Sequence, residues 1–400
     1  IHGQYFHLLG HWVVNSISLF STLRLQGDFD NNTAWETWKE LLNRHPMLRS
    51  RFLVPEDATR FKDYQIEILN NPNPPEIPVT DNRHLDSETQ EQTIANEHLI
   101  SDALGCHTVL REFMEIYRAR TNNEQPNLPP ATTVAEYQQI VQSMNAWQDA
   151  ESEKAFVEYT NRQGTDSYLW NPANNKITSN CPEFHNRRYT LTKETTTALI
   201  SQTREWRLPT NSLLLAAFTR TIAKLEQSDN KSILLQVPTG GRFYPEADAT
   251  NVVGSFAQNL SIDIELPSRA EGWETLLNQV HQKVQQGIAN NYDRTQTRQM
   301  AIAFRDNIVL ENGKIPTRML PMYRQVLKSN LYTPFTGQTQ IEKQYGDLEV
   351  IDYRAGGINA PGTIDILQEI FDDRLQFQAS YDSGFFPESV VNQLMEEYIA

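Results

Sequence analysis

The sequence has little cysteine, no excess of basic residues and no long apolar run, and each shortage excludes a class of protein. Its two cysteines, Cys106 and Cys181, give neither a disulfide framework nor a zinc pattern, and they favour a reducing cytoplasm. Because 50 acidic residues oppose 35 basic ones, and no dense Lys/Arg cluster stands out, we expect no nucleic-acid partner. No apolar run approaches the ~18–20 residues of a membrane span, and the first residues do not form a signal peptide, so no membrane association is expected.

The chain contains enough hydrophobic residues to form the cores of globular domains. Hydrophobic residues make up 39% of the 400 residues and aromatic residues 10%, which excludes a disordered protein. This length suits two domains of roughly 150–200 residues each. The sequence opens with strand character and stops within a helical stretch, so we expect a domain trimmed from a longer protein.

Strand-like and helix-like stretches alternate along the chain, which predicts an α/β fold with two similar halves. A capping box formed by Thr33 and Glu36 is expected to begin the first helix. A polar stretch rich in Asn, Gly, Pro and Ser predicts the boundary, which gives domains over residues 1–165 and 166–400. Strands are predicted at residues 11–25, 48–54, 93–100, 187–191, 233–237, 260–266, 348–353, 363–371 and 375–381. Helices are predicted after residue 33, from residue 109, over residues 137–159, 193–204, 212–225 and 273–288, and from residue 387.

The candidate site is the stretch of residues 97–105, where His98 precedes Asp102 by four residues, between a predicted strand and a predicted helix. A neutral imidazole is the usual proton acceptor near neutral pH. A carboxylate close to it can orient the ring or hold the loop that presents it. The spacing alone is a weak signal, because such pairs arise by chance in a chain of this length.

Several blocks in a fixed order make the signal stronger. The motif around His98 is similar to His-His-x-x-x-Asp-Gly, and Arg-His-Pro-Met-Leu-Arg-Ser-Arg-Phe upstream is similar to a strand entry of the same family. The other blocks are residues 128–130 with Tyr137 and Tyr159, residues 238–243, 253–260, 329–330, 345–351 and 373–386. Together they resemble the condensation domains of non-ribosomal peptide synthetases, which belong to the chloramphenicol acetyltransferase-like superfamily of His-dependent acyltransferases.

The chain departs from that family pattern at four places. Glu97 replaces the first His of the motif, and Ala103 replaces its Gly. The segment between Phe52 and His98 is shorter than the family usually carries. The family's His-Gln-Asp-x-Pro-Phe block has no convincing counterpart near residues 290–293.

The resemblance implies two chloramphenicol-acetyltransferase-like subdomains in a V-shaped arrangement with a central tunnel. It implies acyl transfer from a carrier-protein-bound thioester to an amine or hydroxyl acceptor. Two alternatives stay open: a catalytically silent platform that recruits a carrier protein or another enzyme, and a free-standing acyl-CoA-dependent acyltransferase. The expected partners are carrier proteins or neighbouring synthetase domains, with a small-molecule acceptor as an alternative. Neither a metal nor an intrinsically bound cofactor is implied, and the substrates are expected to be tethered on phosphopantetheine.

The resemblance also assigns roles to single residues. His98 would take the acceptor's proton or position its α-amine, and Asp102 would form a structural salt bridge, for which Arg242 is the candidate partner. The alternative for Arg242 is a surface loop arginine. Gly105 is expected to keep the helix start uncrowded. The candidate tunnel or motif neighbours are Glu97, Ala103, Gly254, Asn259, Ser329 and Asn330.

Other polar residues have simpler interpretations. Neighbouring residues of a strand face opposite sides, so Glu97 is expected to point away from His98. If it faces inward instead, its carboxylate would raise the pKa of the imidazole. His45 and His107 are expected to be structural, and Cys106 is expected to lie in the core.

Overall fold

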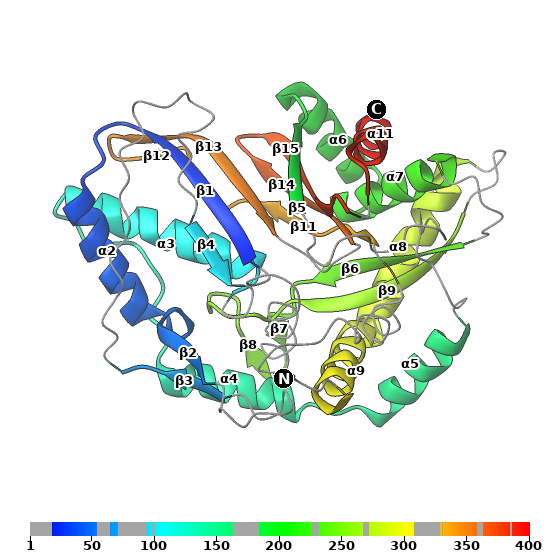
Figure 1. Ribbon diagram of the computed structural model, residues 1–400, viewed down its shortest axis with the longest axis horizontal. Coiled ribbons are helices and arrows are strands. Elements are labelled where there is room, and N and C mark those ends of the chain that lie inside the picture. Colours follow the sequence, from blue (N-terminus) through cyan, green and yellow to red (C-terminus); the bar gives the residue numbers. More distant parts are fainter. Residues whose placement is uncertain are drawn as a thin grey trace.

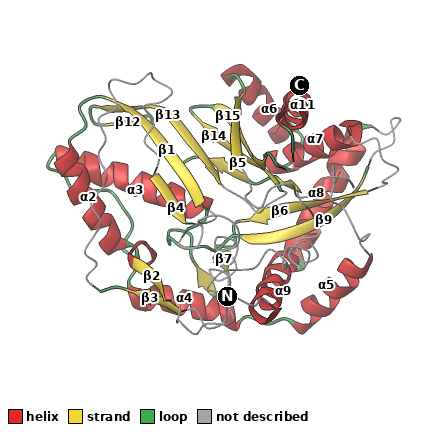
Figure 2. Ribbon diagram, viewed as in Figure 1, coloured by secondary structure: helices red, strands yellow, loops and turns green. Residues whose placement is uncertain are grey.

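Helices and strands interleave along the chain in a mixed α/β architecture (Figure 1, Figure 2). The computed structural model describes residues 18–53, 65–70, 94–97, 101–162, 184–225, 232–266, 272–307, 329, 331–357, 363–384 and 386–400. Two of the predicted site residues, His98 and Asn330, lie outside these ranges. Within them, no helix is both long enough and apolar enough to span a membrane.

The first part of the chain contributes short strands and four main helices. Its elements are β1 (Ser18–Gln26), α2 (Asn31–Arg44), the 3-10 helix η1 (Pro46–Arg49), β2 (Ser50–Leu53), β3 (Gln65–Ile68), β4 (Ile94–Glu97), α3 (Ala103–Thr121), α4 (Val134–Ala146) and α5 (Ala150–Arg162).

The second part contributes most of the strands. Its elements are β5 (Phe184–Thr190), α6 (Lys193–Glu205), α7 (Thr210–Leu225), β6 (Ser232–Thr239), β7 (Phe243–Tyr244), β8 (Ala247–Asp248), β9 (Gln258–Glu265), α8 (Trp273–Ala289), α9 (Tyr292–Asn307), β10 (Leu331–Tyr332), β11 (Phe335–Gln338), β12 (Gln344–Tyr345), β13 (Leu348–Gly357), β14 (Ile364–Phe371), β15 (Arg374–Asp382) and α11 (Glu388–Ile399).

Two sheets contain most of the described strands, while β2 pairs only with β3 and β7 only with β8. The larger has the order β5-β15-β14-β10-β6-β9, with β11 also paired to β14, and mixes parallel and antiparallel neighbours. The smaller has the order β12-β13-β1-β4 and is antiparallel. Strands β12 and β13 of the second part therefore lie in the same sheet as β1 and β4 of the first part. The division at residues 165 and 166 stays a prediction.

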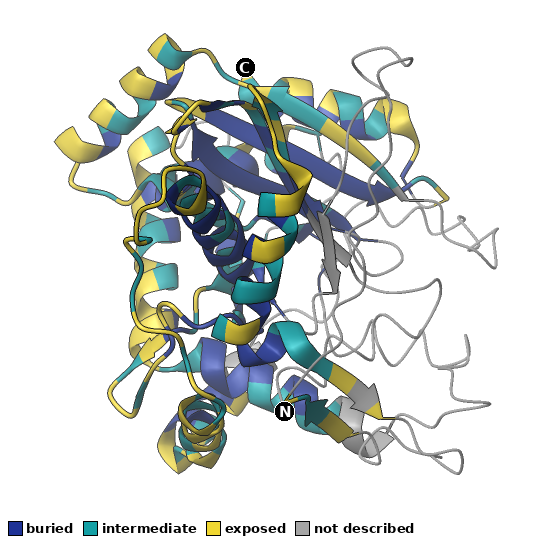
Figure 3. Cartoon of the chain, turned by 90° about the vertical axis from the view of Figure 1, so that its left-hand side faces the viewer, coloured by how far each residue is buried: buried dark blue, intermediate teal, exposed yellow. Residues whose placement is uncertain are grey.

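The main core lies between the larger sheet and the helices α7, α8 and α11. β6 is buried continuously from Ile233 to Val237, because both of its faces are covered. Figure 3 shows these buried strands in the interior and the exposed faces of the helices outside. The sheet therefore forms a rigid base for the loops that leave its strand ends.

Three local predictions need correction. The N-cap of α2 is Asp30, whose side chain accepts the amide of Thr33 at 2.6 Å, and the predicted capping box at Thr33 is wrong. Aspartate is at least as good an N-cap as threonine, and the helix begins earlier as a result. The predicted helical stretch over residues 137–159 is two helices, α4 and α5, which meet at a corner after Trp147. Helix α9 has no counterpart among the predicted elements.

Candidate active site

Asp102 is the N-cap of α3, directly after the segment that carries His98. Its Oδ1 accepts the amide of Gly105 at 2.8 Å, which satisfies one of the free donors at the helix start. Its own amide donates to the carbonyl of Gly254 at 3.3 Å. The residue is 3% exposed, so this carboxylate needs strong partners to stay charged.

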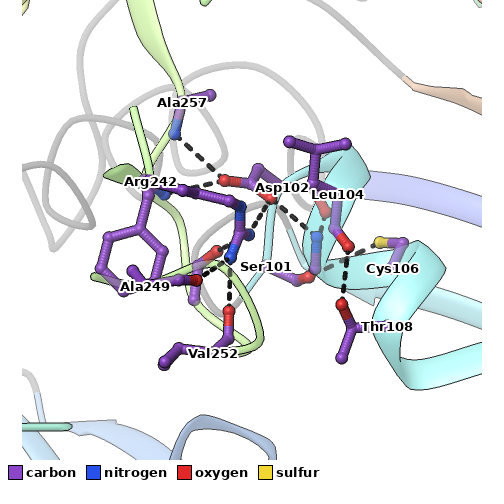
Figure 4. A network of polar contacts seen from close by, with 12 residues as sticks. Ser101, Asp102, Leu104, Cys106, Thr108, Arg242, Ala249, Val252 and Ala257 are labelled. Atoms are coloured by element: carbon purple, nitrogen blue, oxygen red, sulfur yellow. Dashed lines mark hydrogen bonds and ion pairs between the residues drawn. The ribbon is translucent and has the colours of Figure 1, made fainter. Parts of the chain in front are cut away.

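Arg242 is the partner that the structure places against Asp102 (Figure 4). Its Nη2 forms an ion pair with Oδ1 of Asp102, and its Nη1 donates to the carbonyls of Ala249, at 2.9 Å, and Val252. The guanidinium carbon lies 5.1 Å from the centre of the Phe256 ring. Arg242 is only 6% exposed, so it is not the surface arginine of the alternative interpretation.

The second carboxylate oxygen of Asp102 is also satisfied. It accepts the amides of Phe256, at 2.9 Å, and Ala257, at 3.0 Å. Burial raises the pKa of Asp102, but the charge of Arg242 and hydrogen bonds from Arg242 and the backbone amides lower it more, so the pKa lies below its usual range. Asp102 is therefore ionised, and it links α3 to loops of the second part rather than carrying a proton. We call the Asp102–Arg242 pair, together with the backbone groups of Ala249, Val252, Gly254, Phe256 and Ala257 that bond to it, the joint.

Gly105 is enclosed by this joint. A Cβ atom there would lie 2.3 Å from Oγ of Ser101 and 3.2 Å from Nη2 of Arg242. The helix start is crowded on this side, and the missing side chain lets the guanidinium approach. Ser101 itself is fully buried, and its hydroxyl donates to the carbonyl of Asp102.

Replacing Gly241 with alanine is expected to destabilise the protein by more than about 2 kcal/mol. Gly241 has a φ of +59°, and its added Cβ would lie 1.9 Å from the carbonyl oxygen of Phe256, which is backbone and cannot rotate away. Chemical denaturation measures the loss. The matched control is Gly240→Ala, whose Cβ would meet only Leu104 at 3.5 Å. Equal losses in both variants would contradict the prediction.

The remaining site candidates are spread along the joint and the sheet. Ala103 is the first residue of α3, and Gly254 accepts hydrogen bonds from both Asp102 and Arg242 through its carbonyl. The amide of Asn259 donates to Oγ1 of Thr297 at 2.8 Å, and Oγ of Ser329 donates to the carbonyl of Leu234 at 2.6 Å. The structure thus places Ala103 and Gly254 beside Asp102, whereas Asn259 and Ser329 form these hydrogen bonds with other residues of the second part. Their proposed roles in a tunnel stay predictions, as does the tunnel itself.

Glu97 ends β4, where it is paired with Ser18 of β1. The Glu97→His variant is expected to stay folded and as active as the wild type, if Glu97 stands where the resembling family has a non-essential histidine. A thermal melt and a transfer assay measure the two properties. Loss of folding would contradict the view that Glu97 merely takes the place of a dispensable histidine.

Two other histidines have buried carboxylate partners. Nε2 of His45 lies 3.0 Å from Oε2 of Glu112, and Nε2 of His107 lies 3.1 Å from Oε2 of Glu369. Both pairs tie α3 to neighbouring elements, as expected for structural histidines. Cys106 is buried at 2% exposure, in the core as predicted. Among the described residues, no cluster of three or more His, Cys, Asp or Glu side chains could hold a metal ion.

Sequence reasoning missed the partners that complete the joint. The carbonyls of Ala249 and Val252 and the amides of Phe256 and Ala257 are backbone groups, so no residue type marks them. The family-like block at residues 253–260 contains Phe256 and Ala257, whereas no such block contains Ala249 or Val252.

The family model for the Condensation domain matches residues 93–297, just over half of the chain, and the chain belongs to that family. A comparison with curated protein sequences gives no match.

Solved structures share the fold at low sequence identity. The first condensation domain of the calcium-dependent antibiotic synthetase, in complex with a substrate analogue, has a TM-score of 0.71 and 12% identity over 100% of this chain and 92% of its own. The EpoB NRPS cyclization-docking bidomain from Sorangium cellulosum has a TM-score of 0.68 and 14% identity, covering 100% and 82% of the two chains. Polyketide synthase associated protein 5 from Mycobacterium tuberculosis has a TM-score of 0.68 and 15% identity, covering 100% and 96%.

Proposed function

We propose that the chain transfers an acyl group from a carrier-protein-bound thioester to an amine or hydroxyl acceptor, in non-ribosomal peptide or hybrid polyketide biosynthesis. Membership of the condensation-domain family supports this proposal. The observation that carries it is the buried pair of Asp102 and Arg242, which fixes the chain four residues after His98. A reaction between two tethered substrates needs such a fixed loop, because much of the rate comes from orientation.

The proposed step is a nucleophilic substitution at the thioester carbonyl. The acceptor nitrogen or oxygen attacks the thioester carbonyl and loses one proton, the carbon–sulfur bond breaks, and the thiolate leaves and takes up a proton. His98 would accept the acceptor's proton or position its amine. The phosphopantetheine arm belongs to the carrier and enters as part of the substrate. We place the protein in the cytoplasm, where such carriers and reduced cysteines are expected.

A catalytically silent platform is the second candidate. It is favoured by Glu97 and Ala103, which replace the first His and the Gly of the family motif. Such a protein would bind a carrier or another enzyme through the same fold without turnover. A free-standing acyl-CoA-dependent acyltransferase would share the fold and the motif.

Intact-mass spectrometry of the carrier protein separates these three functions. The purified chain is incubated with an acyl-loaded carrier and a panel of amine and hydroxyl acceptors, free or carrier-bound, and in parallel with acyl-CoA in place of the loaded carrier. Acyl transfer from the carrier above the protein-free rate supports the proposal. Transfer from acyl-CoA alone supports the free-standing enzyme, and carrier binding without transfer supports the platform.

A further inference from the structure

The segment of residues 239–246 runs from the last residue of β6 through β7 to the turn before β8, and carries Arg242 near its middle. Arg242 reaches across to Asp102 of the first part. Its position therefore depends on what holds the two ends of this segment. Both ends are held by adjacent residues of one helix, α9, which sequence reasoning did not predict.

Asp293 holds the first end. Its Oδ2 accepts the hydroxyl of Thr239 at 2.6 Å, and its Oδ1 accepts the amide of Arg294 at 2.9 Å. Asp293 is 5% exposed, so water competes little for these bonds. The carboxylate thus fixes the residue at which β6 ends.

Arg294 holds the second end. Its guanidinium carbon lies 3.8 Å from the ring centre of Tyr244 and 4.0 Å from that of Trp147, and its Nη2 forms an ion pair with Glu246. Arg294 is 6% exposed, and a desolvated cation over an aromatic face is one of the stronger contacts of this kind. Through these contacts, Arg294 of α9 holds the β7–β8 hairpin against α9 and against Trp147, at the corner between α4 and α5.

Helix α9 is itself fixed to the larger sheet. Gln296 accepts the amide of Ser261 at 2.7 Å, and Thr297 accepts the amide of Asn259 at 2.8 Å, both from β9. Figure 1 shows α9 alongside β9, close to α5. The start of α9 is therefore a rigid support from which Asp293 and Arg294 act.

We propose that Asp293 and Arg294 are positioning residues, which hold the 239–246 segment so that Arg242 meets Asp102 at the start of α3, four residues after His98 in the sequence. Neither residue contacts Asp102, and both act through Arg242. Their effect on catalysis rests on the proposed function, whereas their effect on the joint does not.

Hydrogen exchange at the amides of Phe256 and Ala257 tests the proposal without an activity assay, because both amides donate to Asp102. In Arg294→Met and in Asp293→Asn these amides are expected to exchange on the order of tenfold faster than in the wild-type chain, as the joint opens more often. The variant Arg294→Lys keeps the cation and the ion pair with Glu246, and should regain part of the protection.

Arg298→Met is the matched control. Arg298 lies one turn further along α9 and donates to the carbonyls of Asn145 and Trp147, at the corner between α4 and α5. Its loss is expected to leave the exchange of Phe256 and Ala257 unchanged. If Arg294→Met and Asp293→Asn fold with unchanged exchange at both amides, or if Arg298→Met accelerates it equally, the proposal is overturned.

The transfer assay adds the catalytic readout. Where the wild-type chain is active, Arg294→Met is expected to lower kcat about tenfold with KM within twofold, because the ion pair of Arg242 and Asp102 next to the motif is disturbed. Faster exchange together with an inactive wild-type chain would refute the proposed function and leave the positioning role standing. Normal activity with unchanged exchange would refute the positioning role alone.

Discussion

Replacing His98 with alanine is expected to lower the rate of acyl transfer by about 10²- to 10⁴-fold, the usual contribution of a general base. The acceptor would lose the group that takes its proton or positions its amine. Product formation from a loaded carrier, followed by intact mass, measures the rate. The thermal melt should stay close to that of the wild type, because the substitution leaves the ion pair of Asp102 and Arg242 in place.

His281→Ala is the control for a histidine outside the site. Nδ1 of His281 lies 3.0 Å from the hydroxyl of Ser212, between α8 and α7. This variant is expected to keep the transfer rate. Equal product yield from His98→Ala and the wild type would refute the catalytic role of His98, whereas carrier binding with no product from either protein would favour the silent platform.

Replacing Arg242 with methionine is expected to lower the free energy of unfolding by about 3–5 kcal/mol, the range found when one partner of a buried ion pair is removed. Asp102 would remain at 3% exposure with a charge and no cation beside it. Chemical denaturation measures the loss. Arg188→Met gives a graded control, because its pair with Asp352, at 2.7 Å, is more exposed and should contribute less. A loss below about 1 kcal/mol in Arg242→Met would contradict the prediction that the Asp102–Arg242 ion pair stabilises the fold.

The same variant should change how stability depends on pH. The pKa of Asp102 is lowered in the folded chain, so its contribution is present above the unfolded pKa of about 4 and is lost as the pH falls through the folded value. Without Arg242, burial dominates and the pKa of Asp102 rises. We therefore expect the stability difference between the wild type and Arg242→Met to be largest near neutral pH and to narrow as the pH falls, because a protonated Asp102 needs no cation beside it. Chemical denaturation at a series of pH values measures this difference.

Periodicity predicts the helices that bury an apolar stripe. Helix α8 is predicted over residues 273–288 and found at Trp273–Ala289, because Leu276, Leu277 and Val280 mark its buried face. Helix α9 is buried through polar side chains instead, such as Asp293 and Gln296, so no apolar stripe reveals it. At the break between α4 and α5, the carbonyls of Asn145 and Trp147 accept hydrogen bonds from Arg298, a residue more than a hundred positions away, and local periodicity does not mark such a contact.

The candidate site is also predicted only in part from the sequence. The pairing of Asp102 with Arg242 follows from family-like blocks, which order the chain around the motif. The carbonyls and amides that surround the pair come from loop geometry, which residue types do not encode. The role of His98 stays a prediction that the transfer assay can test.

The placement of β13 has a consequence for biosynthesis. β1 pairs with β13 along almost its whole length, from Leu19 opposite Gly357 to Gln26 opposite Glu349. Its partner is made more than three hundred residues later, so this edge of β1 stays open while the intervening chain leaves the ribosome. Pairing over such a sequence separation is slow to form, and the smaller sheet cannot be completed before residues 348–357 have been made.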